Sequence, residues 1–387
     1  MDTLKLLYRT LLERTDTSYI RYLQHDIDWN SRIISVVGAR GAGKTTLLLQ
    51  HIKNNLDTNK ALFVNADDFY FSENKLFHLA EEFLKFGGKH LFIDEIHKYK
   101  DWSREIKMMY DYLPDLQVVF TGSSILDIYK GQADLSRRVL SYYMHGLSFR
   151  EFLNLKLNKN YKAYSFEQII SNQVKLDEKP LPLFKEYLEI GYYPFFLEDN
   201  YTERLKNVIN QTIEVDIPMF TDMNVSTARK LKQLLYIIAE SVPFKPNFTK
   251  IGEHIGVHRN QVTEYMIYLE QAGLINRLLD DNKGMRALGK VQKLYLNNTN
   301  MCAAIGAQNS NIGNMRETVF FNQAKLKMDV IASPISDFQL NEFTFEVGGK
   351  NKKQTQIKNA SHAYLVKDDI EYGIGNIIPL WAFGFMY

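Results

Sequence analysis

Apolar residues gather in short runs along the N-terminal part of the chain, and amphipathic stretches separate these runs. Short apolar runs between turn residues predict buried strands at Ile33 to Val37, Ala61 to Asn65, Leu91 to Ile93 and Gln117 to Phe120. The stretch from Lys75 to Phe86 repeats its apolar residues at helical spacing and is followed by two glycines, which is a helix stop signal. This part of the chain is therefore expected to alternate strands with helices.

The pattern changes further along the chain. Residues 154–245 are mainly helical in pattern. Asn247 to Leu279 has the spacing of two helices around a tight turn at Gly256, typical of a winged helix-turn-helix, with Asp280 to Gly284 as its wing. The C-terminal region returns to alternation: a helix is predicted at Asn314 to Lys327, and strands at Asp337 to Leu340, Thr344 to Val347, Ala363 to Lys367 and Ile377 to Leu380.

Composition narrows the class of protein. The chain has 387 residues, of which 45% are hydrophobic, and this length suggests about two or three domains. Its 47 basic and 45 acidic side chains leave a formal charge of +2, so the net charge does not predict a nucleic-acid or membrane partner. A local basic face is the alternative that net charge does not exclude. The single cysteine, Cys302, forms no internal disulfide and suits a reducing compartment. Without a signal peptide or a long uncharged apolar run, we expect a cytoplasmic protein with no membrane partner.

The first strand leads into a glycine-rich turn and a helix start. Gly38 to Thr45, GARGAGKT, fits the pattern G-x-x-x-x-G-K-[ST], whose backbone N–H groups wrap a polyphosphate. Lys44 is expected to reach the β- and γ-phosphates of ATP, and the Thr45 hydroxyl to bind Mg²⁺. The predicted ATP-binding residues are Gly38, Ala39, Arg40, Gly41, Ala42, Gly43, Lys44, Thr45 and Thr46.

A second motif follows the third strand. Asp94 is expected to hold Mg²⁺, and Glu95, turned the other way by the two-residue period of the strand, to polarise the attacking water. At the end of the next strand, Ser123 is the first candidate for sensing the γ-phosphate and Thr121 the second. Arg137 and Arg138 are adjacent cations that either stabilise the transferring phosphoryl group or form an ordinary surface pair.

Two further stretches carry weaker signals. The carboxylates of Asp67 and Asp68 follow the second strand, where they either solvate a loop or touch the site. The aromatic and acidic stretch from Tyr19 to Trp29 either covers the base side of the nucleotide or serves packing.

These motifs, with Gly146 to Leu153 (GLSFREFL) and Phe345 to Lys352 (FEVGGKNK), resemble the bacterial and archaeal AAA-type ATPases. That resemblance implies an α/β P-loop core with a parallel sheet flanked by helices, and the nucleotide at the carboxyl ends of its strands. It favours Arg138 over Arg137, acting in trans within a homo-oligomer. The implied domains are an ATPase domain with its N-terminal helix at 1–153, a helical lid at 154–245, a winged helix at 246–298 and a small α/β nuclease-like domain at 299–387.

The nuclease-like fold implied by the resemblance permits a check on its residues. Glu317, Asp337 and Glu346 fill the three acidic positions that hold metal in such sites, but Gly348 stands where a lysine is needed, and Lys350 lies two residues further on. The simpler alternative pairs these acids with nearby lysines as ordinary ion pairs, namely Lys350, Lys352 and Lys353. We expect a catalytically silent domain that serves as a docking platform for a protein partner.

The sequence thus predicts a magnesium-dependent ATPase that couples hydrolysis to a rearrangement of its C-terminal half. A helicase is a rival because Asp94 to His97 spells D-E-x-H, but no second motor domain is found. Other rivals are a DNA-binding regulator, a nucleotide-gated switch with very slow hydrolysis, and an ATP-regulated nuclease. DNA is not favoured as a partner, because the second helix of the winged-helix stretch carries Arg259 against Glu264 and Glu270, a net charge of −1.

Overall fold

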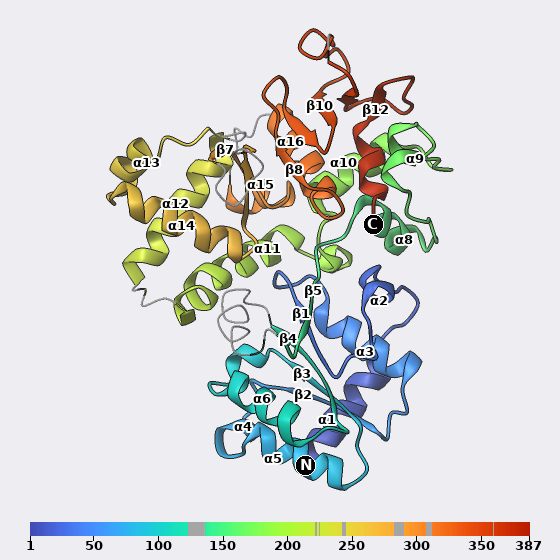
Figure 1. Cartoon of the computed structure of the whole chain (residues 1–387), viewed down its shortest axis with the longest axis vertical. Coiled ribbons are helices and arrows are strands. Elements are labelled where there is room, and N and C mark those ends of the chain that lie inside the picture. Colours follow the sequence, from blue (N-terminus) through green and yellow to red (C-terminus); the bar gives the residue numbers. More distant parts are fainter. Residues whose placement is uncertain are drawn as a thin grey trace. The chain divides into compact units, whose positions relative to one another are not determined.

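The computed structural model describes residues 1–122, 135, 137–220, 223, 225–241, 245–281, 290–306, 312–358 and 360–387. The chain divides into two compact units, Met1–Gly146 and Leu147–Tyr387. Figure 1 shows both units. Among the helices of the described residues, none is both long enough and apolar enough to cross a membrane.

The first unit is built on a five-stranded parallel sheet in the order β2-β3-β4-β1-β5. Its strands are β1 (Ile33–Val37), β2 (Ala61–Asn65), β3 (His90–Asp94), β4 (Gln117–Gly122) and β5 (Leu140–Tyr143). β1 is buried at every position, because a parallel sheet covered on both faces needs continuous apolar strands.

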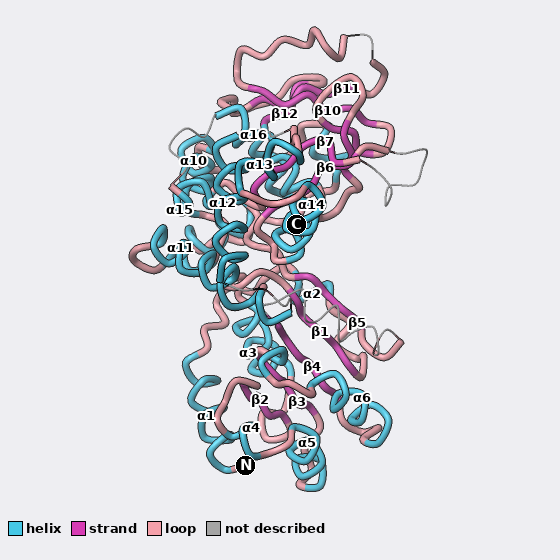
Figure 2. The backbone as a smooth tube through the Cα atoms, turned by 90° about the vertical axis from the view of Figure 1, so that its left-hand side faces the viewer, coloured by secondary structure: helices cyan, strands magenta, loops and turns pink. Residues whose placement is uncertain are grey.

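Helices flank both faces of this sheet. The helices of the unit are α1 (Asp2–Arg14), α2 (Leu23–Asp26), α3 (Lys44–Asn55), α4 (Tyr70–Glu73), α5 (Leu76–Lys85) and α6 (Trp102–Tyr112). Figure 2 shows α1 and α3 on one side of the strands and α5 and α6 on the other. This is the P-loop fold that the sequence predicted, and the predicted strands lie within one or two residues of the observed ones.

The second unit contains a mixed sheet, a two-stranded antiparallel sheet and a set of helices. The mixed sheet has the order β12-β11-β10-β9-β8, with β8 (Val330–Ala332), β9 (Phe338–Leu340), β10 (Phe343–Gly348), β11 (Ala363–Lys367) and β12 (Ile377–Pro379). The ring of Phe320 packs against the rings of Phe338, Phe345 and Phe383 in its core. The short strand β8 was not predicted.

The helices of the second unit precede the mixed sheet in sequence. They are α8 (Phe149–Leu157), α9 (Phe166–Ile170), α10 (Pro180–Ile190), α11 (Tyr201–Gln211), α12 (Val225–Ser241), α13 (Phe248–Ile255), α14 (Arg259–Gln271), α15 (Asn300–Ile305) and α16 (Ile312–Ala324). Gly256, at φ 69°, turns the chain from α13 towards α14, and β6 (Ile275–Leu279) then pairs antiparallel with β7 (Val291–Leu296). The predicted wing extends to Gly284, where it lies partly outside the described residues.

Candidate functional site

The phosphate loop connects β1 to α3 at the carboxyl edge of the parallel sheet. Gly41 and Gly43 have φ of 81° and 96°, values that side chains other than glycine rarely adopt. At Gly38, an added Cβ would lie 2.2 Å from the carbonyl oxygen of Met144, so only glycine fits there. The buried Lys44 donates from Nζ to the carbonyls of Gly38, at 2.9 Å, and Ala39, at 3.0 Å, which holds its charge inside the loop.

Asp94, the last residue of β3, lies between two threonines from neighbouring elements. Thr45 Oγ1 donates to Asp94 Oδ2 at 2.6 Å, and Thr121 Oγ1 donates to Asp94 Oδ1. Burial raises the pKa of the Asp94 carboxyl, while both threonine hydrogen bonds act to lower it. A buried carboxylate with this balance gains from a nearby cation.

Glu95 leaves the strand in a left-handed conformation, with φ 52°. Its backbone N–H donates to Thr121 Oγ1 at 3.2 Å, so Thr121 holds both Asp94 and the backbone of Glu95. The predicted reason for the orientation of Glu95 was therefore wrong: the strand has already ended at Asp94, and a positive φ rather than strand alternation sets its direction.

His97 lies beside Glu95 and was not predicted to belong to the site. Its side chain is fully buried, and its Nε2 lies 3.5 Å from Glu95 Oε2. Burial lowers the pKa of His97 to about 4, although Glu95 acts to raise it, so the ring is neutral at pH 7. The signal for His97 in the sequence is the D-E-x-H spelling, which by itself indicates a helicase feature.

The oxygens at this edge fit Mg²⁺. The Thr45 hydroxyl and the Asp94 carboxylate are the hard oxygen donors that Mg²⁺ takes, and they are already in contact. Within the described ranges there is no cluster of three or more His, Cys, Asp or Glu side chains suited to a metal. Mg²⁺ at nucleotide sites is usually held by one or two carboxylates together with substrate phosphates, rather than by an all-protein cage.

The remaining predicted residues of the first unit fall in different places. Ser123 lies outside the described residues. Arg138 precedes β5, and its Nε lies 3.3 Å from Asp111 Oδ1 at the end of α6. Because β5 and β1 are parallel and pair from Leu140 and Ile34, Arg138 sits at the amino edge of the sheet, roughly six residues or 20 Å of strand from the phosphate loop.

Residues of the aromatic N-terminal stretch pack within the first unit. Trp29 stacks on His51 with ring centroids 3.5 Å apart, and its carbonyl accepts from Gln117 at the amino edge of β4. Arg21, from the same stretch, is buried; it donates to Ala42 O at 2.7 Å, to His145 O at 2.8 Å and to Gly146 O at 3.0 Å. Sequence patterns could not reveal this role, because all three acceptors are backbone carbonyls.

The second unit places two of the three acids of the predicted nuclease-like site, Glu317 and Asp337, around one lysine. Lys293 Nζ of β7 lies 2.8 Å from Glu317 Oε2 and 3.0 Å from Asp337 Oδ1. Burial acts to lower the pKa of Lys293, but the two carboxylates outweigh it and raise that pKa. Glu346 pairs with Lys352, as the simpler alternative expected, whereas Lys293 was not anticipated because it lies on a distant strand.

Comparison with known families agrees with the geometry of the first unit. Residues 30–153 match the family described as "AAA domain". Residues 181–312 match a "Domain of unknown function (DUF8612)". The first unit is therefore an AAA-type P-loop ATPase domain, joined to a region whose family has no assigned function.

The chain resembles an archaeal protein of unknown role. It is 25% identical over 309 residues to the uncharacterized protein MJ1637 of Methanocaldococcus jannaschii, covering 74% of this chain and 63% of that protein. The chain thus spans less than two thirds of the length of this relative.

Two solved structures show weaker likenesses. A structure of katanin self-assembly is 19% identical, with 35% of this chain and 49% of that chain covered and a TM-score of 0.26. The S. cerevisiae Hsp104–ADP complex is 16% identical, with 67% and 42% covered and a TM-score of 0.31. Likenesses at these scores say nothing about function.

Proposed function

We propose that this protein binds ATP with Mg²⁺ and hydrolyses it at the carboxyl edge of the parallel sheet. The observation that carries the proposal is the contact of Thr45 with Asp94, which joins the phosphate loop to the end of β3. In P-loop ATPases these two positions hold the same magnesium ion.

Each residue at this edge has a defined role. Lys44 binds the β- and γ-phosphates as a point charge. Thr45 and Asp94 would hold Mg²⁺, which would supply positive charge against the charge that develops on the phosphates. Glu95 accepts a proton from the attacking water, and Thr121 fixes the backbone of Glu95 through its hydrogen bond.

Steady-state ATP turnover with and without Mg²⁺ tests this function. We expect phosphate release that requires Mg²⁺ and falls to background in Asp94→Asn, because the amide cannot supply the charge. Asp115→Asn changes a carboxylate just before β4, outside the site, and is expected to keep wild-type turnover. Equal turnover in Asp94→Asn and the wild type would refute the proposed site.

Hydrolysis is proposed to act on the second unit through the end of the first. The carbonyls of His145 and Gly146, the last residues of the first unit, accept from Arg21, which also binds Ala42 in the phosphate loop. A phosphate that shifts the loop therefore pulls on the segment that leads to Leu147. Arg21→Lys keeps the charge but loses the fork of donors.

Hydrogen exchange measures this coupling. In the wild type, ATP is expected to change amide exchange in residues of the second unit, and Arg21→Lys is expected to shrink that change while still binding ATP. An unchanged ATP response in Arg21→Lys would remove Arg21 from the path.

We also propose that Arg138 acts on the nucleotide of a neighbouring copy. Its place at the amino edge of the sheet, against Asp111 and 5.4 Å from the Tyr110 ring, keeps it away from its own phosphate loop. A cation in that place acts on ATP only in trans, which requires a homo-oligomer.

The second unit is proposed as a protein-docking part with a silent nuclease-like fold. Lys293 bridges Glu317 and Asp337 where a metal ion would have to bind both. In the winged-helix region, Glu270 of α14 pairs with Arg277 of β6, which favours internal packing over DNA contact. Plasmid cleavage with Mg²⁺ or Mn²⁺ is expected to be absent; cleavage that Asp337→Ala and Glu346→Ala abolish would show an active nuclease.

A further inference from the structure

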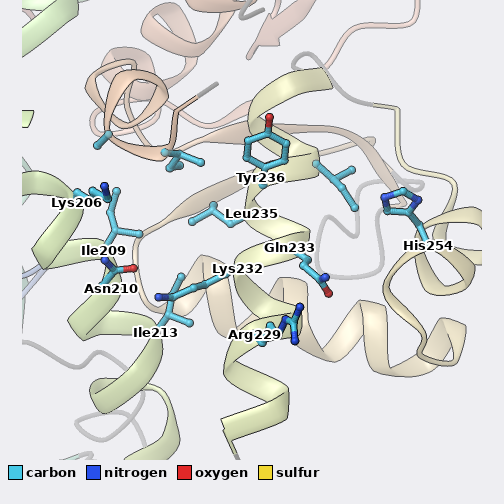
Figure 3. A pocket seen from close by; sticks show the side chains of 13 residues that line it. Lys206, Ile209, Asn210, Ile213, Arg229, Lys232, Gln233, Leu235, Tyr236 and His254 are labelled. Atoms are coloured by element: carbon cyan, nitrogen blue, oxygen red, sulfur yellow. The ribbon is translucent and has the colours of Figure 1, made fainter. Parts of the chain in front are cut away.

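A cavity of about 390 Å³ opens in the second unit between α11, α12, α13 and α15. Figure 3 shows its lining, with side chains of α11 on one side, α12 across the middle and His254 of α13 beyond. The cavity is distant in sequence from every residue assigned above to ATP, and it lies within residues whose family has no assigned function.

The lining separates into an apolar floor and a polar rim. Ile209, Ile213, Leu235 and Ala304 line the cavity and are buried, so they form the floor. The exposed lining residues are polar or amphipathic and form the rim, among them Lys206, Arg229, Gln233, Tyr236 and His254.

The lining residues of α11 and of α12 each lie on one face of their helix. Lys206, Asn210 and Ile213 follow one another at intervals of four and three along α11 and the turn after it, so they share one face. On α12 the same is true of Arg229, Lys232 and Tyr236. Two facing rows of about two turns each therefore enclose a slot about 10 Å long.

A slot of this kind is unusual as a packing defect. Protein interiors contain few voids larger than a water molecule, whereas ligand sites are mostly apolar and measure about 300–1,000 Å³. The cavity falls in that range, with an apolar floor and few polar groups at its edge. Its size suits a small molecule.

The charge at the rim of the cavity indicates the charge of the ligand. Lys232 pairs with Glu214 at 2.6 Å, which neutralises that lysine. Lys206 and Arg229 take part in no ion pair within the described part of the chain, so two cations over an apolar floor keep their full charge. An anionic head over an apolar body satisfies both features at once.

We propose that this cavity binds an amphipathic organic anion, a molecule with an apolar chain or ring and one carboxylate, sulfonate or phosphate head. The apolar body lies on Ile209, Ile213 and Leu235, and the head lies at the rim, in the field of Lys206 at one end of the slot and Arg229 at the other. This site is independent of the nucleotide site, so either proposal can fail while the other holds.

Fluorescence of anilinonaphthalene sulfonate, an aromatic anion, reports binding to the full-length protein, and dodecanoate is the competing ligand. We expect saturable binding of one probe molecule per protein chain. In competition with the probe, the dissociation constant of dodecanoate should be at least ten times lower than that of dodecyltrimethylammonium, which has the same alkyl chain and the opposite charge. Dodecanol separates the contribution of the chain from that of the head.

Charge variants at exposed positions test the assignment without touching the core. Lys206→Glu and Arg229→Glu are each expected to weaken dodecanoate about fivefold or more, and the double variant to prefer dodecyltrimethylammonium. Lys230→Glu is the matched control: Lys230 is also on α12 but does not line the cavity, and its Nζ donates to Gly256 O. It should bind as the wild type does.

A variant that fills the slot provides a second measurement. Ala304→Phe is expected to abolish saturable probe binding, with unfolding temperature measured beside it to show that the chain still folds. Absence of saturable binding in the wild type would overturn the proposal, as would equal affinity for the two dodecyl ions, or a double variant that behaves like Lys230→Glu.

Discussion

Each unit of this protein places carboxylates beside a sheet, but the two sites differ in what faces those carboxylates. In the first unit Asp94 accepts hydrogen bonds from two threonine hydroxyls, and Lys44 donates to loop carbonyls instead. In the second unit the ammonium group of Lys293 lies against both Glu317 and Asp337. The carboxylate of the first unit thus contacts only neutral hydroxyl groups among these partners, whereas the two carboxylates of the second unit are neutralised by a lysine.

The difference shows why acidic residues at strand ends do not by themselves define a metal site. A hydroxyl leaves the charge of the carboxylate in place, so a magnesium ion gains from binding there. A lysine at 2.8 to 3.0 Å from both acids satisfies them already, and a metal ion would have to displace it.

Removing the phosphate-loop lysine should affect both ATP binding and turnover. Lys44→Ala is expected to lose ATP binding and to lower turnover by a factor of about a thousand or more, because the proposed role of its charge is to bind the phosphates. Binding of a fluorescent ATP analogue and phosphate release measure the two losses. Lys85→Ala, an exposed lysine on α5, is the control; wild-type binding by Lys44→Ala would break the comparison.

Arg138→Ala should come next, with turnover reduced by a factor of about a thousand if the arginine acts between copies. Mixing it with Lys44→Ala protein should restore part of the activity. In a mixed oligomer, the Arg138→Ala copy supplies an intact phosphate loop and the Lys44→Ala copy supplies an intact Arg138. Turnover per chain should also rise with protein concentration. A strictly monomeric particle in ATP, with no rescue on mixing, would contradict a role in trans.

In the second unit, Lys293→Met is expected to destabilise the fold by about 2 kcal/mol. Breaking a buried ion pair costs about 3–5 kcal/mol, and the residual exposure of these side chains reduces the figure. Local hydrogen exchange around α16 and β9 measures the loss. Lys353→Met, at an exposed lysine, should leave stability unchanged.

The pH dependence of the stability lost in Lys293→Met tests whether Lys293 neutralises Glu317 and Asp337. Burial raises the pKa of Glu317, and Asp337 raises it further, while Lys293 opposes both. An acid with a raised pKa in the folded state favours folding more as the pH falls through that pKa towards its unfolded value. The stability lost in Lys293→Met should therefore shrink between pH 7 and pH 4.5; a loss independent of pH would mean that the lysine matters only for packing.

The first unit should respond to acid in the opposite direction, with the smallest effect. Burial lowers the pKa of His51 from 6.5 to about 4, and His90 adds to this. The unfolded chain then takes up the proton first, so stability is full above pH 6.5 and falls towards pH 4. At pH 5.5 the loss is about 1 kcal/mol, which His51→Gln should remove. An identical pH profile in His51→Gln would contradict this account.

Local patterns in the sequence predicted the parallel sheet, the phosphate loop and the order of the main elements. The nucleotide-binding residues Gly38 to Thr45 and Asp94 can be recognised from sequence spacing alone, because they lie at the end of a predicted strand or between a strand and a helix start. Contacts between distant segments could not be predicted this way. Lys293 meets Glu317 through the pairing of separate elements, and Arg21 binds backbone carbonyls, which leave no trace in sequence.

The orientation of Glu95 also escaped prediction, because it depends on a single backbone angle at a strand end. The proposed division of the second unit into lid, winged helix and nuclease-like domain stays a prediction. The same holds for the part assigned to Ser123.

The account rests on hydrolysis of ATP with Glu95 as the base, and Glu95→Gln tests it most directly. ATP binding and phosphate release are measured on the same Glu95→Gln preparation. We expect ATP binding within about twofold of the wild type and phosphate release slower by a factor of about a hundred to ten thousand, the contribution of a general base. Wild-type phosphate release by Glu95→Gln would contradict the central claim.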